Sequence, residues 1–524
     1  MCSSDLVEEE SVERLHHGAA TPLDVQRLVL DLLDVLPIGT GMLPLYLEEL
    51  ATTLAGLCWR LAHPAPDSTV LADADHLGVE AAMREGHPGF VANSGRIGFG
   101  LGDQARFSPE AASGLRLVWL AARRDLAHVS LGDGADLDVL LPAPSTRTRL
   151  EQRLVDLGLD PAGYHLLPVH PWQWEHTLTT TFAPDLARRD LVHLGEDDAV
   201  HVPMQSLRTL ADVADPQRPY VKTAVAVRTM GFTRGLSPAY MVDTPAINDW
   251  VHDLVAADAD LRASGFAVLR ERAAIGYTGD VFHATDATAS APQRKMVAAL
   301  WRESVAGALA PGERAITMAA LLHRDDAGVP LVAELVRRSG LDTATWVRAY
   351  LRAYVRPLVH CLLAHDLAFM PHGENVLVVL RGHRPVRTVM KDIGEEVALL
   401  GPGPLPPACE RIRMEVGPDE APLPILTDVV DGYLRHLAAL LDAEGLLAAE
   451  EMWRLVRGVV EGHAADHPEL AAAGRRYDLL RPRFRHSCLN RLQLRDPRTM
   501  VSLEDQSGSF LYAGWLDNPL SPPR

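Results

Sequence analysis

Residues 372–394, HGENVLVVLRGHRPVRTVMKDIG, place two β-like runs between chemically active side chains. NVLVVL predicts a strand, RGHRP a turn and VRTVMKD a returning strand. Because a strand pair holds its two ends side by side, we expect Asn375 and Asp392 to meet at one edge. An amide oxygen and a carboxylate suit Mg²⁺, which keeps nucleotide phosphates as partners. His372, one turn before the first strand, is placed to touch a phosphate or a reacting carboxylate.

A simpler interpretation of the same stretch stays open. Asn and Asp are common capping residues, so Asn375 and Asp392 can serve only to close the hairpin. His372 is then an ordinary residue of a surface loop.

A second group of residues is basic and polar. Ser206, Arg208 and Thr209 follow a β-like run at 200–204, and Lys222 lies on an alternating run at 220–230. Arg234 comes next, in the glycine-flanked segment MGFTRGLS. Hydroxyls, a guanidinium fork and an ammonium hold phosphates and carboxylates, so these strands predict an anion pocket. The alternative is a solvated strand face with ordinary surface salt bridges.

The composition limits the class of protein. The 524 residues suggest about two to four domains at roughly 100–200 residues each. Fifty Lys plus Arg against 69 Asp plus Glu give a net charge of −19, which disfavours nucleic-acid and membrane-surface roles. The five cysteines form no close pair and fit a reducing cytoplasm. We find no secretory signal and no run of about 18 apolar residues, so we expect a cytoplasmic protein.

The pattern along the chain predicts an α+β fold in three regions. Residues 1–145 are mostly helical, and leucines from Leu43 to Leu61 form one apolar helix face. Residues 146–345 are mixed, with short strands, a helix that begins at Thr244 and a surface loop at 275–295. Residues 346–524 contain a helix with Pro357 inside it, the hairpin quoted above and a loop at 401–407.

Two further segments carry motifs. His170-Pro-Trp-Gln173 ends a short strand, and Glu85-Gly-His-Pro-Gly leads into a second glycine-containing run. The simplest interpretation of both is a structural turn. The P-loop, dinucleotide, zincin and hydrolase signatures are all missing from the sequence, so those enzyme classes lack support.

Taken in order, these segments resemble the IucA/IucC family, the siderophore synthetases that work without a nonribosomal peptide synthetase. The family pattern is GHPxHPxxKxR, HPWQ, S-x-R-T, Lys with Arg twelve residues later, H-G-x-N, and Asp twenty residues after that His. This sequence has GHPGFVANSGR, HPWQ, SLRT, Lys222 with Arg234, HGEN, and His372 with Asp392. The C-terminal third resembles the FhuF-type region of the family. Five residues depart from the family pattern and bear on the substrate subtype: Phe90, Val91, Ser94, Met230 and Met370.

The resemblance implies ATP- and Mg²⁺-dependent activation of a carboxylate, typically citrate or a citryl half-amide and sometimes 2-oxoglutarate. An acyl-adenylate and pyrophosphate form first. An amine, hydroxylamine or alcohol then attacks, which gives an amide or ester and AMP. Precise positioning and neutralisation of the triphosphate charge are what such a reaction needs.

Carried over residue by residue, the resemblance assigns four groups of roles. Ser206, Arg208, Thr209 and Lys222 hold phosphates, and Lys391 adds a phosphate contact. Asn375 and Asp392 serve nucleotide and metal. Arg234 and His372 bind the carboxylate and the developing charge, and His170 and Gln173 shape the substrate pocket.

The family fold is a cupped hand of thumb, fingers and palm, with a palm distantly similar to kinases. The three predicted regions correspond to those parts, and family members are often homodimers. The partners implied are small carboxylates and amines or alcohols, with no nucleic acid and no membrane.

Two other classes of function remain as alternatives. A small-molecule kinase also has an H-G-x-N strand followed by D-x-G, but it places a catalytic Asp where Glu374 stands here. The second alternative is a non-catalytic siderophore- or iron-binding protein, suggested by the FhuF-like region. Iron–sulfur proteins of that type cluster their cysteines, whereas Cys488 stands alone.

Overall fold

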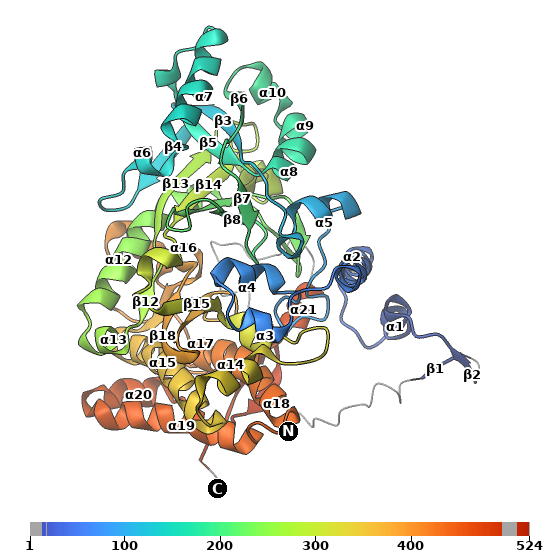
Figure 1. Cartoon of the computed structure of the whole chain (residues 1–524), viewed down its shortest axis with the longest axis vertical. Coiled ribbons are helices and arrows are strands. Elements are labelled where there is room, and N and C mark those ends of the chain that lie inside the picture. The colour runs from blue at the N-terminus through green and yellow to red at the C-terminus, as the bar shows by residue number, and fades with distance from the viewer. Residues whose placement is uncertain (1–12, 17, 495–510, 523–524) are drawn as a thin grey trace.

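The computed structural model describes residues 13–16, 18–494 and 511–522. The molecule is an elongated α+β body in which three sheets follow one another along the long axis (Figure 1). Helices α14, α15 and α18–α20 gather at its lower end, and β1, β2 and α1 project to one side (Figure 1). Mixed helix and sheet content confirms the predicted α+β class, while the cupped-hand and kinase-like details stay predictions.

The three-stranded sheet has the order β5-β3-β6 and is antiparallel throughout. Its central strand is the apolar run VWLAAR, which is almost wholly buried. This strand lies inside the region predicted to be mostly helical, so that prediction is wrong here. A short, continuously apolar run is ambiguous between helix and strand until its neighbours are known. The strands are β3 (Val118–Arg123), β5 (Tyr164–Val169) and β6 (Leu191–Glu196).

The six-stranded sheet, with the order β4-β13-β14-β9-β8-β7, forms the middle of the molecule. The predicted strand at 220–230 is shorter than expected, because β9 ends at Thr223. The predicted loop at 275–295 also begins late, since residues up to Tyr277 belong to β13. The strands are β4 (Ala127–Leu131), β7 (His201–Pro203), β8 (Thr209–Asp212), β9 (Tyr220–Thr223), β13 (Glu271–Tyr277) and β14 (Ala298–Arg302).

The four-stranded sheet contains the predicted hairpin and has the order β12-β18-β17-β15. Strands β17 and β18 are antiparallel, whereas β12 and β18 are parallel. Helix α15 (Thr343–His365) packs on this sheet; Asp342 caps its start and the helix runs through Pro357. The strands are β12 (Ala267–Val268), β15 (Glu313–Thr317), β17 (Val376–Arg381) and β18 (Arg384–Met390).

Strands pair across both predicted region boundaries. Strand β4, before residue 145, pairs with β13, and β15, before residue 345, pairs with β17. The three regions are therefore linked by backbone hydrogen bonds, and their exact limits stay predictions.

Helix α2 (Met42–Ala62) carries the predicted leucine face, but only its first half is buried. Leu50 is 3% exposed, whereas Leu54 and Leu61 are 45% and 69% exposed. The predicted apolar face is thus covered by other elements in its first half and exposed in its second half. Periodicity alone does not reveal how much of a helix face another element covers.

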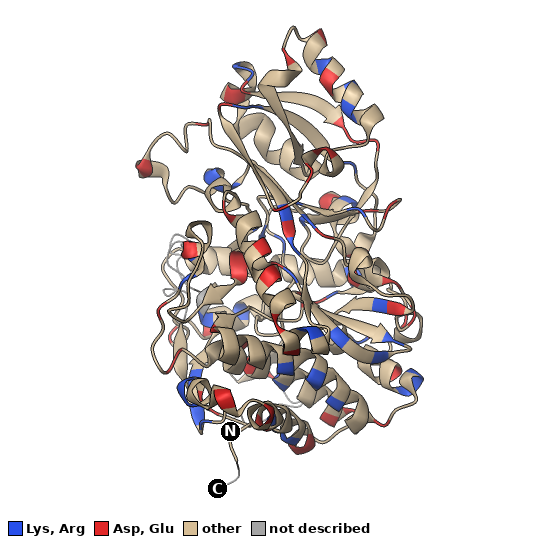
Figure 2. Cartoon of the chain, turned by 90° about the vertical axis from the view of Figure 1, so that its left-hand side faces the viewer, with Lys and Arg blue, Asp and Glu red and all other residues tan. Residues whose placement is uncertain are grey.

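The remaining elements are mostly short. No helix among the described residues is long and apolar enough to span a bilayer. Basic and acidic residues are interspersed along the length of the molecule (Figure 2). The remaining strands and helices are β1 (Arg14–His16), β2 (Ala19–Thr21), β10 (Arg228–Thr229), β11 (Phe232–Thr233), β16 (Leu367–Ala368), β19 (Ala398–Leu399), β20 (Arg483–Ser487), β21 (Tyr512–Asp517), α1 (Val25–Asp31), α3 (Ser68–Leu71), α4 (His76–Ala82), α5 (Leu101–Phe107), α6 (Leu137–Leu140), α7 (Pro144–Asp156), α8 (Pro171–Gln173), α9 (Thr179–Thr181), α10 (Ala183–Ala187), α11 (Pro238–Met241), α12 (Thr244–Ala257), α13 (Ala259–Ser264), α14 (Leu331–Ser339), α16 (Ile393–Glu396), α17 (Leu423–Ile425), α18 (Arg435–Ala443), α19 (Ala449–Asp466), α20 (Ala471–Tyr477) and α21 (Leu489–Gln493).

Candidate active site

The two ends of the β17–β18 hairpin meet as predicted. The backbone N–H of Lys391 donates to the carbonyl of Asn375 at 2.9 Å, one step beyond the last ladder pair. Asp392 follows in the left-handed region, with φ of 60°, and turns the chain into the short helix α16. Gly394 is required in this turn, because an added Cβ would lie 2.5 Å from the Thr244 side chain. The hairpin therefore fixes Asn375, Lys391 and Asp392 at one edge.

Asp392 joins this hairpin to the neighbouring six-stranded sheet. Its Oδ1 accepts from Lys222 Nζ at 2.5 Å, and its Oδ2 accepts from Arg302 NH1 at 2.8 Å. Lys222 comes from β9 and Arg302 from the end of β14, which pairs with β9. Both cations are buried, at 3% and 1% exposed. Two sheets that are distant in the sequence thus share one ionic junction.

Further carboxylates surround Lys222. Its Nζ lies 3.2 Å from Glu395 Oε2 and 3.7 Å from Glu271 Oε1. Burial works against the charged ammonium, but attraction to Asp392, Glu395 and Glu271 outweighs it and raises the pKa of Lys222. Lys222 was predicted to lie on an anion-binding strand face; in the structure its charge is matched by carboxylates of the same chain.

The pKa values of Asp392, directly before α16, and of Glu396, at its end, shift in opposite directions. Burial disfavours ionised Asp392, but Lys222 and Arg302 hold its pKa well below its usual value. For Glu396, burial and then repulsion by Asp392 raise the pKa to about 8. Asn375 Nδ2 donates to this Glu396 carboxylate and, at 3.1 Å, to the Met370 carbonyl. Asn375, Asp392 and Glu396 therefore bring an amide and two carboxylates together.

The predicted phosphate-binding residues lie beside this junction. Thr209 on β8 is the register partner of Lys222 on β9. Ser206 Oγ donates to Thr209 Oγ1 at 2.8 Å, and Arg208 NH2 lies 3.8 Å from Glu395 Oε2. The sequence therefore grouped Ser206, Arg208, Thr209 and Lys222 correctly in space.

Arg234 reaches the same cluster from an irregular segment. After Thr223 the chain leaves the sheet, and residues 224–236 fold back on themselves around the short strands β10 and β11. Val225 N–H donates to the Arg234 carbonyl at 2.9 Å, and Arg234 Nε donates to Thr229 Oγ1 at 2.7 Å. Burial lowers the pKa of Arg234, and nearby Glu374 opposes that change.

His372 lies directly before the hairpin and contacts the first sequence motif. Its ring meets that of His87 edge-on, with centroids 5.7 Å apart, and His87 in turn meets Phe90 at 5.9 Å. Burial lowers the pKa of His372 and takes that of His87 to about 3, so both rings are neutral near pH 7. His87, first interpreted as part of a structural turn, is thus a neighbour of His372.

The departures from the family pattern lie around the same region. Met230 has a φ of 50°, and its sulfur lies 3.0 Å from the position that a Cβ added to Gly86 would take. The carbonyl of Met370 holds the Asn375 amide, while the side chain of Met370 is 42% exposed. Ser94 Oγ is buried and makes no hydrogen bond.

His170 and Gln173 support the backbone. His170 is fully buried; its Nδ1 accepts from Trp172 N–H at 3.1 Å, and its ring packs on Phe107. Gln173 Oε1 accepts from Ala226 N–H at 2.8 Å, which holds the segment that carries Arg234. Their predicted contact with substrate stays a prediction.

Sequence reasoning missed four charged members of the cluster. Arg302 closes the apolar run AALW, where a buried arginine is rare without a partner, and that was the available signal. Glu395 and Glu396 stand within four residues of Asp392 in DIGEE and were equally readable. Glu271 carried no signal, because only the fold brings β13 to Lys222.

Comparison with known proteins decides the family. Residues 75–323 match the IucA / IucC family, and residues 344–502 match the ferric iron reductase FhuF-like transporter family. The chain is 42% identical over 518 residues to the putrebactin synthase of Shewanella sp. (strain MR-4), with 98% of this chain and 82% of that protein covered. The chain belongs to the IucA/IucC family of siderophore synthetases. This confirms the resemblance inferred from the ordered motifs.

Other IucA/IucC-type proteins extend the comparison. The citryl-spermidine/3,4-dihydroxybenzoyl-citryl-spermidine:spermidine ligase of Bacillus anthracis is 30% identical over 62% of this chain and 52% of that protein. The aerobactin synthetase IucC from a hypervirulent pathotype of Klebsiella pneumoniae has a TM-score of 0.81 at 27% identity, over 96% of this chain and 87% of that one. The ATP-bound aerobactin synthetase IucA from the same pathotype shares the fold, with a TM-score of 0.75 at 19% identity over 97% and 89% of the two chains.

Proposed function

We propose that this member of the family is an ATP- and Mg²⁺-dependent synthetase that adenylates a carboxylate and passes the acyl group to a nucleophile. The acid is citrate, a citryl-type acid or 2-oxoglutarate, and the nucleophile is an amine, hydroxylamine or alcohol. A carboxylate oxygen attacks the α-phosphorus and pyrophosphate leaves; the nucleophile then attacks the acyl carbon and AMP leaves. The products are an amide or ester, AMP and pyrophosphate.

The observation that carries this proposal is the junction at Asp392. Lys222 and Arg302 meet Asp392 beside Asn375; Thr209 lies on the adjoining strand and Arg208 directly precedes it. A polyphosphate in a site that excludes water is stabilised by buried cations and hard oxygen donors. Here two sheets hold such a set of side chains in place. The names of the relatives add support, since one is a synthase, one a ligase that acts on a citryl amine, and one was solved with ATP bound.

The donor set at the hairpin end suits Mg²⁺. Asn375, Asp392 and Glu396 offer amide and carboxylate oxygens, and a carboxylate oxygen has two lone pairs, so the salt bridges of Asp392 leave room for a ligand. We assign Asn375 and Asp392 as metal ligands and add Glu396. When bound, the ion neutralises phosphate charge and orients the nucleotide.

The residues of the chain divide into two ends. The phosphates are bound at one end, by Ser206, Arg208, Thr209, Lys222 and Lys391. Arg234 and His372 bind the carboxylate substrate: the guanidinium pairs with the carboxylate, and the neutral imidazole donates or accepts a hydrogen bond next to it. Gln173 and His170 act at a distance, by holding the segment of Arg234 and the start of α8.

The proposal is tested by pyrophosphate release. The full chain is assayed with Mg·ATP against citrate, 2-oxoglutarate and a citryl half-amide, each with diamines, hydroxylamines and amino alcohols. We expect acid-dependent pyrophosphate and AMP, with citrate-type acids as the best substrates. Asp392→Asn should abolish this release, while Asp253→Asn, a matched change of an exposed aspartate on α12, should not.

The alternatives make opposite predictions in the same assay. If no acid stimulates pyrophosphate release and ADP accumulates with a hydroxyl acceptor, the chain is a kinase. If neither product forms and the chain retains a ferric siderophore on gel filtration, it is a binding protein.

A homodimer and a cytoplasmic location are part of the proposal. Light scattering of the purified chain tests the first and fractionation of the producing cell tests the second. The loss of activity on dilution to monomer would show that the assembly matters for catalysis.

A further inference from the structure

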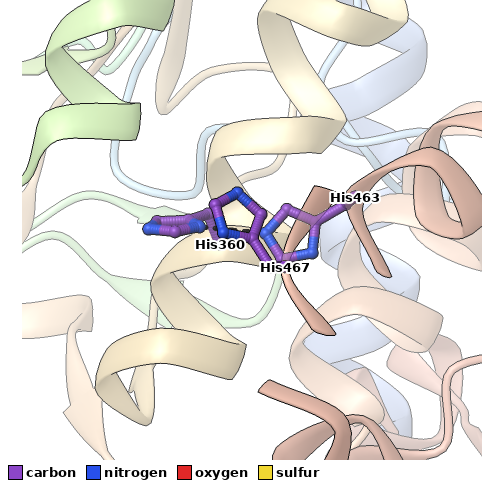
Figure 3. A group of neighbouring side chains, drawn as sticks. All are labelled: His360, His463 and His467. Carbon is purple, nitrogen blue, oxygen red and sulfur yellow. Dashed lines mark hydrogen bonds between the residues drawn. The ribbon is translucent and has the colours of Figure 1, made fainter. Parts of the chain in front are cut away.

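A cluster of histidines lies where α15 packs against α19, outside the candidate active site. His463 and His467 are four residues apart at the end of α19, a spacing that puts both on one side of the helix. His360 projects from the last third of α15. The three rings converge, as Figure 3 shows, and a nitrogen of each lies within 4.8 Å of a nitrogen of the others.

A carboxylate faces the same nitrogens. Asp260 Oδ2 lies 3.7 Å from His360 Nδ1, and Asp260 Oδ1 lies 3.4 Å from His467 Nε2. Asp260 Oδ2 is buried and accepts no hydrogen bond. A buried carboxylate oxygen without a donor is costly, so this atom favours a cationic partner.

Outer carboxylates set the tautomers of two of the rings. Asp258 Oδ2 lies 3.2 Å from His360 Nε2, and Glu469 Oε1 lies 2.9 Å from His467 Nδ1. Each carboxylate holds a proton on the ring nitrogen that it contacts, His360 Nε2 or His467 Nδ1. The other nitrogen of each ring, His360 Nδ1 or His467 Nε2, then carries a lone pair that points into the cluster. Protein metal sites use this arrangement to orient their histidine ligands.

The separations between the inward atoms fit one small ion. His360 Nδ1 lies 2.9 Å from His463 Nε2. The two oxygens of Asp260 reach different rings, Oδ1 at 3.4 Å from His467 Nε2 and Oδ2 at 3.7 Å from His360 Nδ1. Ligands bound at about 2.0–2.1 Å to a tetrahedral ion are roughly 3.3–3.4 Å apart. The three histidine nitrogens, all within 4.8 Å of one another, therefore approach the spacing of ligands around one ion, and Asp260 completes the set when one of its oxygens turns toward them.

Arg356 lies at the cluster but does not neutralise its acids. Arg356 lies 3.2 Å from Asp260 Oδ1, 2.8 Å from Asp466 and 3.5 Å from His467 Nε2. It therefore faces Oδ1 of Asp260 and leaves Oδ2 to the histidines. The acidic residues around the cluster outnumber Arg356, so their charge balances a divalent ion. They are Asp258, Asp260, Asp466 and Glu469.

We propose that His360, His463, His467 and Asp260 bind a divalent transition-metal ion, with Zn²⁺ as the first candidate. Three imidazole nitrogens beside one carboxylate favour Zn²⁺ over Mg²⁺, which prefers hard oxygen ligands. Four protein ligands fill a tetrahedral ion, which makes the site structural. The ion fastens α19 and the start of α13 to α15, and α13 leads into β12, the parallel partner of β18.

The test uses Zn²⁺ alone, in an excess of Mg²⁺ that occupies the hairpin end. The chelator-treated full chain is incubated with Zn²⁺, passed through gel filtration and analysed by mass spectrometry for metal, and its Tm is measured. We expect about one tightly bound Zn²⁺ per chain and a higher Tm. Co²⁺ in its place should give the visible bands of a four-coordinate site.

Two variants make the result specific. His467→Gln keeps a polar side chain at a partly exposed helix end and should weaken Zn²⁺ binding at least tenfold, whereas His252→Gln, an exposed histidine of α12, should not. Asp392→Asn should retain the tight Zn²⁺. The inference is wrong if the wild type binds no more Zn²⁺ than His467→Gln, or if Asp392→Asn loses the ion. Either result leaves the proposed synthetase reaction untouched.

Discussion

The β17–β18 hairpin and the segment after β9 approach the same charged cluster from opposite sides, but they are held in different ways. The hairpin lies inside a four-stranded sheet, with β15 on one flank and β12 on the other. Residues 224–236 leave their sheet and are held by scattered backbone hydrogen bonds and by side chains, not by a continuous ladder. Gln173 Oε1 accepts a hydrogen bond from Ala226 N–H at 2.8 Å, and Glu49 Oε1 accepts one from Gly231 N–H at 2.5 Å.

This difference separates chemistry from positioning. On the hairpin side a backbone ladder places Asn375, Lys391 and Asp392, so a side-chain change there alters charge while the backbone stays in place. On the other side, side chains such as that of Gln173 act together with scattered backbone hydrogen bonds to place Arg234. Variants on the hairpin side should therefore fail in chemistry, and variants that loosen residues 224–236 should fail in substrate affinity.

The largest effect is expected for Asp392→Asn. It removes the charge that pairs Lys222 with Arg302 and the charge of a proposed metal ligand. Pyrophosphate release should fall by about 100-fold or more at every acid concentration, and the Mg²⁺ requirement should rise. Initial rates over a Mg²⁺ titration measure both effects, and a thermal melt reports whether the variant folds. Normal Mg²⁺ dependence in a folded variant would contradict the metal assignment.

Lys222→Ala and Arg208→Ala should differ, although both were placed on one anion-binding face. Lys222 is buried among Asp392, Glu395 and Glu271, so its loss leaves unpaired charges and should cost about 3–5 kcal/mol of unfolding free energy. Arg208 is more accessible, at 12% exposed, and its loss should mainly weaken ATP binding. Urea unfolding and nucleotide titration of both variants separate the effects. Equal loss of stability in the two variants would contradict this reading of their burial.

The sequence predicted the β17–β18 hairpin and the meeting of its two ends, although it missed Glu395 and Glu396. Local patterns fix such a unit: apolar alternation, a Gly-His turn and polar ends, all within about one supersecondary motif. The set Ser206, Arg208, Thr209 and Lys222 was also grouped correctly, because strands β8 and β9 are neighbours in sequence and in space.

The parts that sequence reasoning missed depend on long-range contacts. The strand pattern at 220–230 continues past Thr223, yet the chain turns away because Gln173, about fifty residues earlier, supplies the hydrogen bond that a strand partner would give. Arg302 and Glu271 join the cluster only through strand pairing. Strand β14 pairs with β9 and with β13, and β13 also pairs with β4. Nothing within a local window specifies those registers.

Arg234→Lys should have a smaller effect than the changes above and should act on the acid alone. Lysine keeps the charge but loses the planar fork that matches a carboxylate. The KM for the acid should rise about tenfold, which corresponds to roughly 1.4 kcal/mol, while ATP affinity stays close to that of the wild type. Kinetics with each substrate varied in turn test this. An unchanged KM for the acid would place the carboxylate elsewhere.

The smallest effect is expected for Gln173→Leu, and it tests the comparison directly. The change removes the acceptor of Ala226 N–H and the weaker donor to the Met296 carbonyl at 3.2 Å, which should cost about 1–3 kcal/mol of stability. Because that contact holds the segment of Arg234, the KM for the acid should also rise, by about two- to fivefold.

Thr388→Val is the matched control on the hairpin side. Thr388 is buried on β18 and donates to the Ala353 carbonyl at 2.7 Å, so this variant also loses one buried side-chain hydrogen bond. It should lower the Tm by a similar amount but leave the KM for the acid unchanged, because the strand ladder still places Asn375 and Asp392. If both variants raise the KM equally, substrate affinity follows global stability. Residues 224–236 are then held no more loosely than the hairpin, and the distinction between the two sides fails.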